Sequence, residues 1–181
     1  MRSILSVVLV LCALASCQPK EENYPTTDPR LGTRSYCNNP SAVNYNWDFP
    51  GKPDNSVCFF GPDLFKGAFS YRDTIFRPDG TIDSPRSGRA YNLTIYGLDT
   101  SRAVLVGLCP GGDTVYMHTP RTGFRASFDS STVKGQRLCR VQDTVSGTLL
   151  RELSNTNSIS LSFTVFSDTA VNLHKGTAYR R

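Results

Sequence analysis

The chain has 181 residues with a formal net charge of +5 at pH 7, and 39% of its residues are hydrophobic. This length suits one core domain with a small annex, and the balance of hydrophobic and charged residues is not that of a disordered chain. The basic excess is mild and forms no dense basic stripe, so we expect no nucleic-acid partner.

The first seventeen residues have the organisation of an export signal. Arg2 provides a positive start, and residues 4–14 form an apolar run that is too short to span a membrane, which takes about 20 residues. The run ends in the sequence LASC, residues 14–17. This sequence resembles the lipobox of bacterial lipoproteins, which implies removal of residues 1–16, transfer of a diacylglyceryl group to Cys17 and acylation of its new amine. The alternative is a soluble secreted protein in which Cys17 is incidental.

Residues 17–36 are expected to form a flexible tether, because they carry several prolines and no apolar periodicity. Within the tether, QPKEEN at residues 18–23 resembles the export tag of Bacteroidota lipoproteins. That resemblance implies a lipid-anchored protein of the outer membrane that is exposed on the cell surface. The alternative is an anchor on the periplasmic face.

Residues 37–59 are expected to form a small stapled loop. They fit the pattern C-x-x-P-x-A-x-N-Y … C between Cys37 and Cys58, which resembles a module of Bacteroidota surface and secreted proteins. The resemblance implies a Cys37–Cys58 disulfide, worth roughly 3 to 4 kcal/mol on the chain-entropy estimate. The Asn and Asp residues of this loop do not have EF-hand spacing and are ordinary turn formers, so no metal site is predicted.

From residue 60 to residue 181 the sequence alternates with a period of two between turn-forming stretches. In residues 157–167, for example, Ile159, Leu161 and Phe163 share one face while serines occupy the other, as in a strand with one wet face. The predicted strands lie within residues 65–71, 88–98, 102–108, 114–119, 122–128, 133–139, 144–153, 157–167 and 170–180.

These short strands predict an all-β, antiparallel fold, since no segment is available for a long crossover helix. A single barrel is favoured because closure removes exposed edges, and because Gly67 and Gly176 occupy similar places in the first and last strands. The order of elements resembles the meander of small lipocalin-like domains in Bacteroidota lipoproteins. A Greek-key sandwich is the alternative.

Cys109 and Cys139 remain as a second cysteine pair. After export the mature chain would hold four cysteines in an oxidising compartment, which allows three disulfide connectivities. We expect the local pairing, Cys37–Cys58 with Cys109–Cys139, because the first pair lies within its own module.

No pattern of catalytic residues stands out, so we expect neither an enzyme nor a cofactor. The histidines, His118 and His174, each lie within a strand-like segment, without Cys/His spacing for zinc. No G-x-S-x-G nucleophile elbow occurs.

Two less specific sequence features are those expected of a protein of the cell envelope. A group of basic residues suits an anionic glycan or lipid headgroup, or else is outward-facing charge; it comprises Arg121, Arg125, Lys134, Arg137 and Arg140. Four Asp-Thr-apolar triplets resemble the acceptor of Bacteroidota O-glycosylation, with the hydroxyls of Thr74, Thr114, Thr144 and Thr169.

The sequence therefore predicts a lipid-anchored, non-catalytic accessory or binding module at the outer membrane. One alternative is a calycin-type carrier of a small apolar ligand; another is a structural subunit of an outer-membrane protein complex. An eight-stranded barrel either encloses one small molecule or is filled by side chains. The phenylalanines expected to point inward favour filling: Phe65, Phe69, Phe124, Phe128 and Phe163.

Overall fold

The structure is a computed structural model that describes residues 32–46, 51–109, 114–121, 123–130, 135–151 and 154–181. The export signal, Cys17 and most of the tether lie outside these residues. Within the part of the chain that is described, no helix has the length and hydrophobicity needed to cross a membrane.

The cysteine-bounded loop is a small element held by one disulfide and by side-chain hydrogen bonds. It contains the short strands β1 (Ser35–Tyr36) and β2 (Lys52–Pro53) and the 3-10 turn η1 (Asn55–Val57). The Cys37–Cys58 disulfide is present, with the Cα atoms 4.8 Å apart. Asn44 ties the loop together because its amide donates to the Val57 carbonyl at 2.8 Å and its carbonyl oxygen accepts from the Phe59 amide at 2.9 Å.

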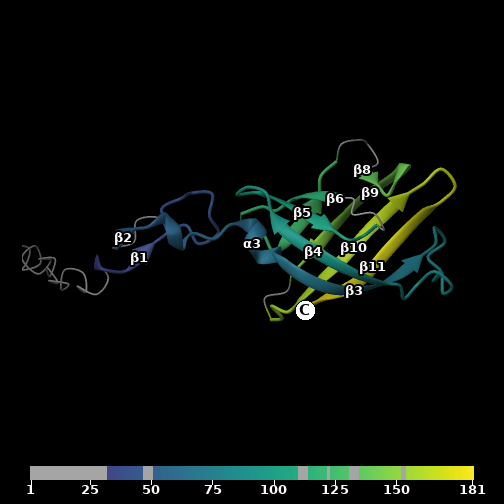
Figure 1. Cartoon of the computed structure of the whole chain (residues 1–181), viewed down its shortest axis with the longest axis horizontal. Coiled ribbons are helices and arrows are strands. Elements are labelled where there is room, and N and C mark those ends of the chain that lie inside the picture. Colours follow the sequence, from purple (N-terminus) through teal and green to yellow (C-terminus); the bar gives the residue numbers. More distant parts are fainter. Residues whose placement is uncertain (1–31, 47–50, 110–113, 122, 131–134, 152–153) are drawn as a thin grey trace, which may run out of the picture. The chain divides into compact units, whose positions relative to one another are not determined.

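The described residues that follow form nine antiparallel strands (Figure 1). Each predicted strand segment overlaps one of them, although β3 continues beyond its predicted segment to Phe76 and β9 begins before its own at Arg140. They are β3 (Gly67–Phe76), β4 (Ala90–Gly97), β5 (Arg102–Val106), β6 (Thr114–His118), β7 (Arg125–Phe128), β8 (Gln136–Leu138), β9 (Arg140–Leu150), β10 (Ser158–Phe166) and β11 (Val171–Arg180).

The strands close into an eight-stranded antiparallel barrel. Each strand pairs with the next strand in sequence, except that β7 pairs with β9 and not with β8. The last strand, β11, returns to pair with the first strand of the barrel, β3, over Leu173–Arg180 and Phe69–Phe76. This up-and-down order is the meander expected from the sequence, and it excludes the Greek-key sandwich. Closure leaves no long edge of the sheet unpaired, which is the physical reason for favouring a barrel.

One of the eight positions in the barrel is filled by two short strands, β7 and β8. Both pair with the same side of β9, β7 with Leu150–Thr148 and β8 with Val145–Arg140. At the start of β8, the Gln136 side chain bonds to β6 as a strand backbone would. Its oxygen accepts from the Tyr116 amide at 2.9 Å and its nitrogen donates to the Tyr116 carbonyl at 2.6 Å. These two bonds provide hydrogen-bond partners for the backbone of Tyr116, which precedes the residues of β6 that pair with β7.

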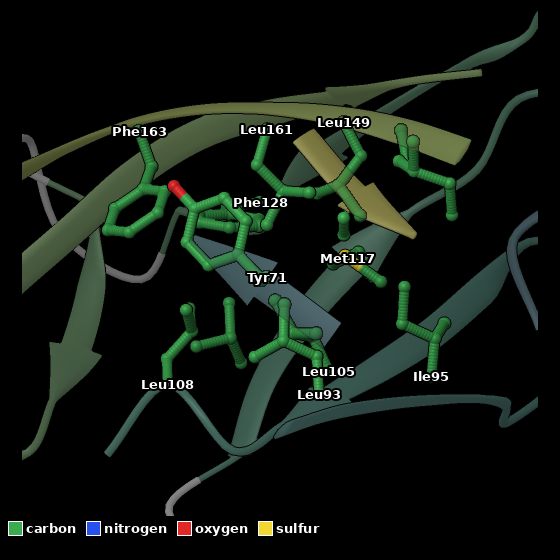
Figure 2. Packing of buried hydrophobic residues seen from close by; sticks show 14 of the residues in the cluster. Tyr71, Leu93, Ile95, Leu105, Leu108, Met117, Phe128, Leu149, Leu161 and Phe163 are labelled. Carbon is green, nitrogen blue, oxygen red and sulfur yellow. The ribbon is translucent and has the colours of Figure 1, made fainter. Parts of the chain in front are cut away.

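Side chains fill much of the barrel interior (Figure 2). Four of the five phenylalanines predicted to point inward belong to the core cluster. Phe124 does not; it precedes β7 and is only half-buried. The cluster comprises Phe65, Phe69, Tyr71, Leu93, Ile95, Ala103, Leu105, Leu108, Cys109, Val115, Met117, Ala126, Phe128, Leu138, Val145, Leu149, Ile159, Leu161, Phe163 and Ala178.

A five-residue helix, α3 (Gly61–Phe65), covers the end of the barrel at which β3 begins. Pro62 supports its first turn, and Phe65 is fully buried in the core. The helix lies against the backbone of Thr119 so closely that a Cβ on Gly61 would stand 2.5 Å from the Thr119 carbonyl oxygen. We call this the closed end of the barrel; the end at which β3 finishes is called the mouth.

Candidate functional site

The mouth of the barrel holds a cavity of about 490 Å³. Its walls come from the ends of strands and from the loops that join them, which is where barrels place ligand sites. The lining residues are Arg86, Arg89, Tyr91, Leu108, Leu138, Cys139, Arg140, Gln142, Asp143, Phe163, Val165, Ser167, Asp168, Thr169, Ala170, Asn172 and His174.

Part of the cavity lining is apolar, although polar side chains make up more of it. Leu108, Leu138 and Phe163 belong to the core cluster and also line the cavity, so the cavity rests directly on the packed interior. Phe163 is the largest of these side chains, and the His174 ring stacks on it with 4.8 Å between ring centroids and 10° between planes. A ligand that enters the mouth therefore meets these apolar side chains at the floor of the cavity, beside polar ones.

A buried acid holds this histidine in place. Asp73 lies in the inward phase of β3 and its side chain is fully buried, whereas His174 lines the cavity. The Asp73 Oδ2 atom lies 2.9 Å from His174 Nδ1. An ionised carboxylate at this distance accepts a hydrogen bond from an Nδ1–H group. This contact orients the His174 ring.

Two tyrosines complete the buried polar group. Burial raises the pKa of Tyr71 well above its usual range, with further contributions from the Asp73 carboxylate and from Tyr91. Burial likewise raises the pKa of Tyr91, and Asp73 adds to the effect while Arg89 opposes it. Neither the Tyr71 hydroxyl nor the Asp73 Oδ1 atom has a hydrogen-bond partner among the described residues. Such orphaned atoms are uncommon in protein interiors and mark a place where water or a ligand group is accommodated.

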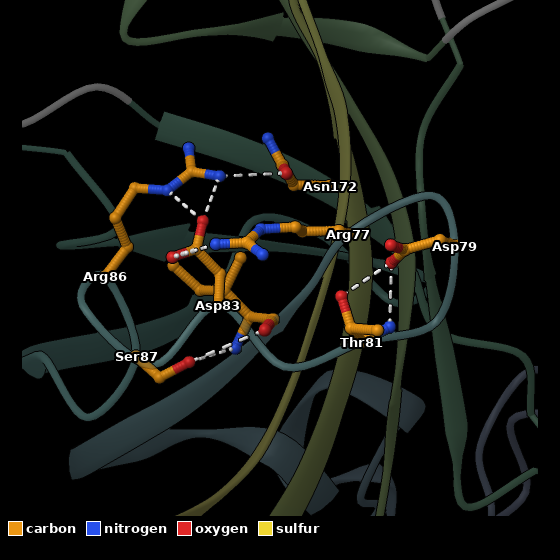
Figure 3. Close-up of polar contacts among 8 residues, drawn as sticks. Arg77, Asp79, Thr81, Asp83, Arg86, Ser87 and Asn172 are labelled. Atoms are coloured by element: carbon orange, nitrogen blue, oxygen red, sulfur yellow. Dashed lines mark hydrogen bonds and ion pairs between the residues drawn. The ribbon is translucent and has the colours of Figure 1, made fainter.

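One of the three arginines at the mouth is held by the protein itself (Figure 3). Arg86 forms an ion pair with the buried Asp83 and donates to the Asn172 side chain at 3.2 Å. Arg77 approaches the same carboxylate at 3.5 Å. The hydrogen bond from Arg86 is the main reason why the pKa of Asp83 lies below its usual value. This network braces the long connection between β3 and β4 against the start of β11.

The other two arginines, Arg89 and Arg140, are exposed at the rim. The Arg89 guanidinium lies over the Tyr91 ring, 5.8 Å from its centroid. Among the described residues neither arginine forms an ion pair with a carboxylate. Two acids, Asp143 on β9 and Asp168 in the β10–β11 turn, also line the cavity.

The structure separates the basic residues that the sequence grouped together. Arg140 lies at the rim of the cavity. Arg125 is exposed on β7, and Arg137 is exposed on β8, where it lines a different hollow. Arg121 contacts the cysteine-bounded loop, where it donates to the Ala42 carbonyl at 2.9 Å and lies over the Tyr45 ring. Lys134 lies outside the described residues.

The four candidate glycosylation hydroxyls differ in accessibility. Thr169 is exposed in the β10–β11 turn, and Thr74 and Thr114 are half-buried in strands. The Thr144 hydroxyl is buried without a partner among the described residues, which is the wrong setting for an acceptor of a glycan. Of the four triplets, the one that ends at Ala170 therefore has the most accessible hydroxyl.

The second predicted disulfide, Cys109–Cys139, is present with its Cα atoms 5.4 Å apart. It joins the segment after β5 to the segment before β9, and Cys139 lines the cavity. Cys139 has a positive φ of 47°, the one such non-glycine residue in the described part of the chain. The disulfide thus fixes one wall of the mouth.

Sequence reasoning missed Asp73, Tyr91, Arg86, Arg89 and the role of His174. A usable signal was present in β3, where Asp73 falls in phase with Phe69, Tyr71 and Ile75. An acid in the inward phase of a barrel strand needs a partner, and the partner comes from the last strand. Across the described residues no group of three His, Cys, Asp or Glu side chains is placed to hold a metal ion.

Comparison with known proteins gives little further information. None of the protein-family models matches the chain, and no curated protein is significantly similar to it. Among solved structures, the chain is similar to a Bacteroides ovatus protein of unknown function, with 14% sequence identity and a TM-score of 0.39. The alignment covers 83% of this chain and 53% of that protein, so the chain spans about half the length of the protein it matches.

Proposed function

We propose that the protein is a lipid-anchored, non-catalytic binding module of the bacterial outer membrane that takes a small molecule into the cavity at the barrel mouth. The observation that carries the proposal is the cavity itself. Its volume of about 490 Å³ falls in the range of roughly 300 to 1,000 Å³ that is usual for small-molecule sites. The anchor is supported by the sequence LASC at residues 14–17.

The lining favours a ligand with both apolar and polar parts over the wholly apolar ligand of a calycin-type carrier. The packed core occupies the middle of the barrel, and the cavity lies at the mouth. There, arginines and acids line the cavity together with Leu108, Leu138 and Phe163. A wholly apolar ligand would leave these polar groups desolvated without partners, which is unfavourable.

Filling the mouth with a bulky side chain tests the proposal. Ala170 lines the cavity from the β10–β11 turn, and its neighbour Val171 is exposed and does not line it. We expect Ala170→Trp to abolish saturable binding of anilinonaphthalene sulfonate and of N-phenylnaphthylamine, two fluorescent amphipathic probes, whereas Val171→Trp leaves it unchanged. If neither probe binds the wild-type protein saturably, or if both variants bind as the wild type does, the mouth is not a binding site.

A further inference from the structure

We propose that the ligand of this cavity is an amphipathic anion, with its apolar body on Phe163 and its anionic group between Arg89 and Arg140. This inference rests on the proposed function, because it names the class of molecule that the mouth cavity would bind. It is carried by the placement, around a cavity with apolar side chains at its floor, of two guanidinium groups that form no ion pair with any described residue.

The arginines at the rim differ in how they are engaged. Arg86 is paired with the buried Asp83, which it shares with Arg77, and is further held by Asn172. The Arg89 guanidinium lies over the Tyr91 ring, and neither Arg89 nor Arg140 forms an ion pair with another described residue. Guanidinium groups pair strongly with carboxylate, sulfonate and phosphate oxygens because they present several N–H donors in one plane.

The order of strands places Arg89 and Arg140 across the mouth from each other. Arg89 directly precedes β4, and Arg140 begins β9. Around the closed barrel, β4 and β9 are separated by β5, β6 and the β7/β8 position in one direction, and by β3, β11 and β10 in the other. Both residues stand at the mouth and line the same cavity, so an anionic group at its entrance is flanked by positive charge on two sides.

The floor between these arginines selects the rest of the ligand. Phe163 and Leu138 are almost fully buried, yet both contribute to the lining. An apolar group placed on them is removed from water, which is favourable by about 25 cal/mol for each Å² buried. A simple inorganic anion gains none of this energy, so the lining favours an anion with an apolar body.

The acids at the mouth are expected to weaken the binding of an anion, and this expectation can be tested. Asp143 and Asp168 line the cavity on the side of β9 and the β10–β11 turn, and their charge opposes an anionic ligand. Asp73 is paired with His174 and Asp83 with Arg86, so these two carboxylates are already engaged inside the protein. Removal of the two rim acids is therefore expected to strengthen the binding of an anion, opposite in sign to removal of the arginines.

The test compares two probes that share an aromatic body. Anilinonaphthalene sulfonate carries an anionic group, and N-phenylnaphthylamine lacks it. Fluorescence titrations of the full protein should show that Arg89→Gln/Arg140→Gln weakens sulfonate binding about tenfold or more, as expected for loss of charged hydrogen bonds. Binding of the uncharged probe should change little. Asp143→Asn/Asp168→Asn should tighten binding of the sulfonate and leave the uncharged probe unaffected.

A matched control removes the same charge elsewhere. Lys66 and Arg72 are exposed and do not line the cavity, so Lys66→Gln/Arg72→Gln should bind both probes as the wild type does. Equal sulfonate affinity in the rim and control variants would overturn the anion inference while leaving the binding site intact. Loss of both probes from the rim variant with native thermal stability would also overturn it, because the arginines would then serve the apolar body. Failure of both probes to bind the wild type would instead refute the proposed function.

Discussion

At the scale of single residues, the buried Asp73 holds one side chain of the cavity wall, His174, in place. A carboxylate away from water is costly unless it is paired or hydrogen-bonded. The Oδ2 atom of Asp73 lies against His174, and Asp73 also interacts with the Tyr91 side chain. Removing the histidine would take away the partner of Oδ2. The same contact holds the His174 ring against Phe163.

Tyr71→Phe should stabilise the protein. The Tyr71 hydroxyl is buried and has no partner among the described residues, so its removal avoids a desolvation penalty of about 1 kcal/mol or more. The raised pKa adds a dependence on pH. A group whose pKa is higher in the folded state contributes stability that is complete below its unfolded pKa of about 10 and is lost as the pH rises further.

The advantage of Tyr71→Phe should therefore grow in alkaline solution. Urea unfolding at pH ~7 and pH ~10.5 measures both effects. Tyr96→Phe is the control, since Tyr96 is exposed on the outer face of β4 and its removal should shift neither value. A variant less stable than the wild type at pH ~7 would show that the hydroxyl is bonded, for instance to a trapped water.

Residue roles were the hardest part to predict from sequence. The period of two correctly placed Ile159, Leu161 and Phe163 in the core, because burial of apolar side chains follows directly from strand alternation. The same alternation places Asp73 and His174 inside, but which two strands become neighbours depends on closure of the sheet. Their partnership spans 101 residues, so a local pattern cannot reveal it.

At the scale of elements, two inward glycines make room for aromatic rings. Gly147 on β9 lies opposite Phe163, and Gly176 on β11 packs against the Tyr71 ring. The sequence suggested that glycines in the first and last strands mark the point where these strands meet. The two strands do pair, but Gly176 lies opposite Asp73, not opposite Gly67. Its role is to accept a neighbouring ring and backbone, not to form a shared corner.

Gly147→Ala should destabilise the barrel. A Cβ at this position would stand 2.4 Å from the Phe163 Cβ and 2.8 Å from the Ser162 carbonyl oxygen. Since the conflict involves atoms close to the backbone, rotation of a flexible side chain cannot relieve it, and we expect a loss of about 1 to 3 kcal/mol. Urea unfolding compares this variant with Ser146→Ala, whose side chain is on the opposite face of β9. Equal midpoints for the two variants would contradict the packing argument.

Some strands could be placed from the sequence more accurately than others. β10 was clear because its polar and apolar residues alternate without interruption over residues 158–165. β7 and β8 are short and share one position in the barrel, with Gln136 bonding to β6 through its side chain. A polar side chain that substitutes for a strand leaves no hydrophobic period, so the split of this position was not visible in the sequence.

At the scale of the whole molecule, the fold class and both disulfides followed from the sequence, while the cavity did not. Turn residues between alternating segments leave an antiparallel sheet as the available solution, and closure protects its edges. The cavity depends on how far side chains fill the mouth, which is decided by tertiary packing. The rim arginines come from the β3–β4 connection and from β9, segments that no sequence motif links.

The proposed anchor makes a prediction about the whole chain. Cys17→Ser should leave the precursor uncut and without lipid, because the thiol is the proposed attachment point, and the protein should no longer be held by acyl chains worth about 0.8 kcal/mol for each buried CH₂. Cys12→Ser is the control, since Cys12 lies in the segment expected to be removed. Intact mass and membrane fractionation give the answer. Normal processing and membrane retention of the Cys17→Ser protein would contradict the anchor.

The path of the chain through the barrel has a practical consequence. The chain enters at the closed end, through α3 and the start of β3, and the last strand returns to the same end, where the Arg181 amide donates to the Ala68 carbonyl at 3.0 Å. All the loops that line the cavity lie at the opposite end. An affinity tag or a surface linker appended after Arg181 therefore leaves from the side remote from the mouth. Immobilised in this way, the protein presents an unobstructed opening to ligands in solution.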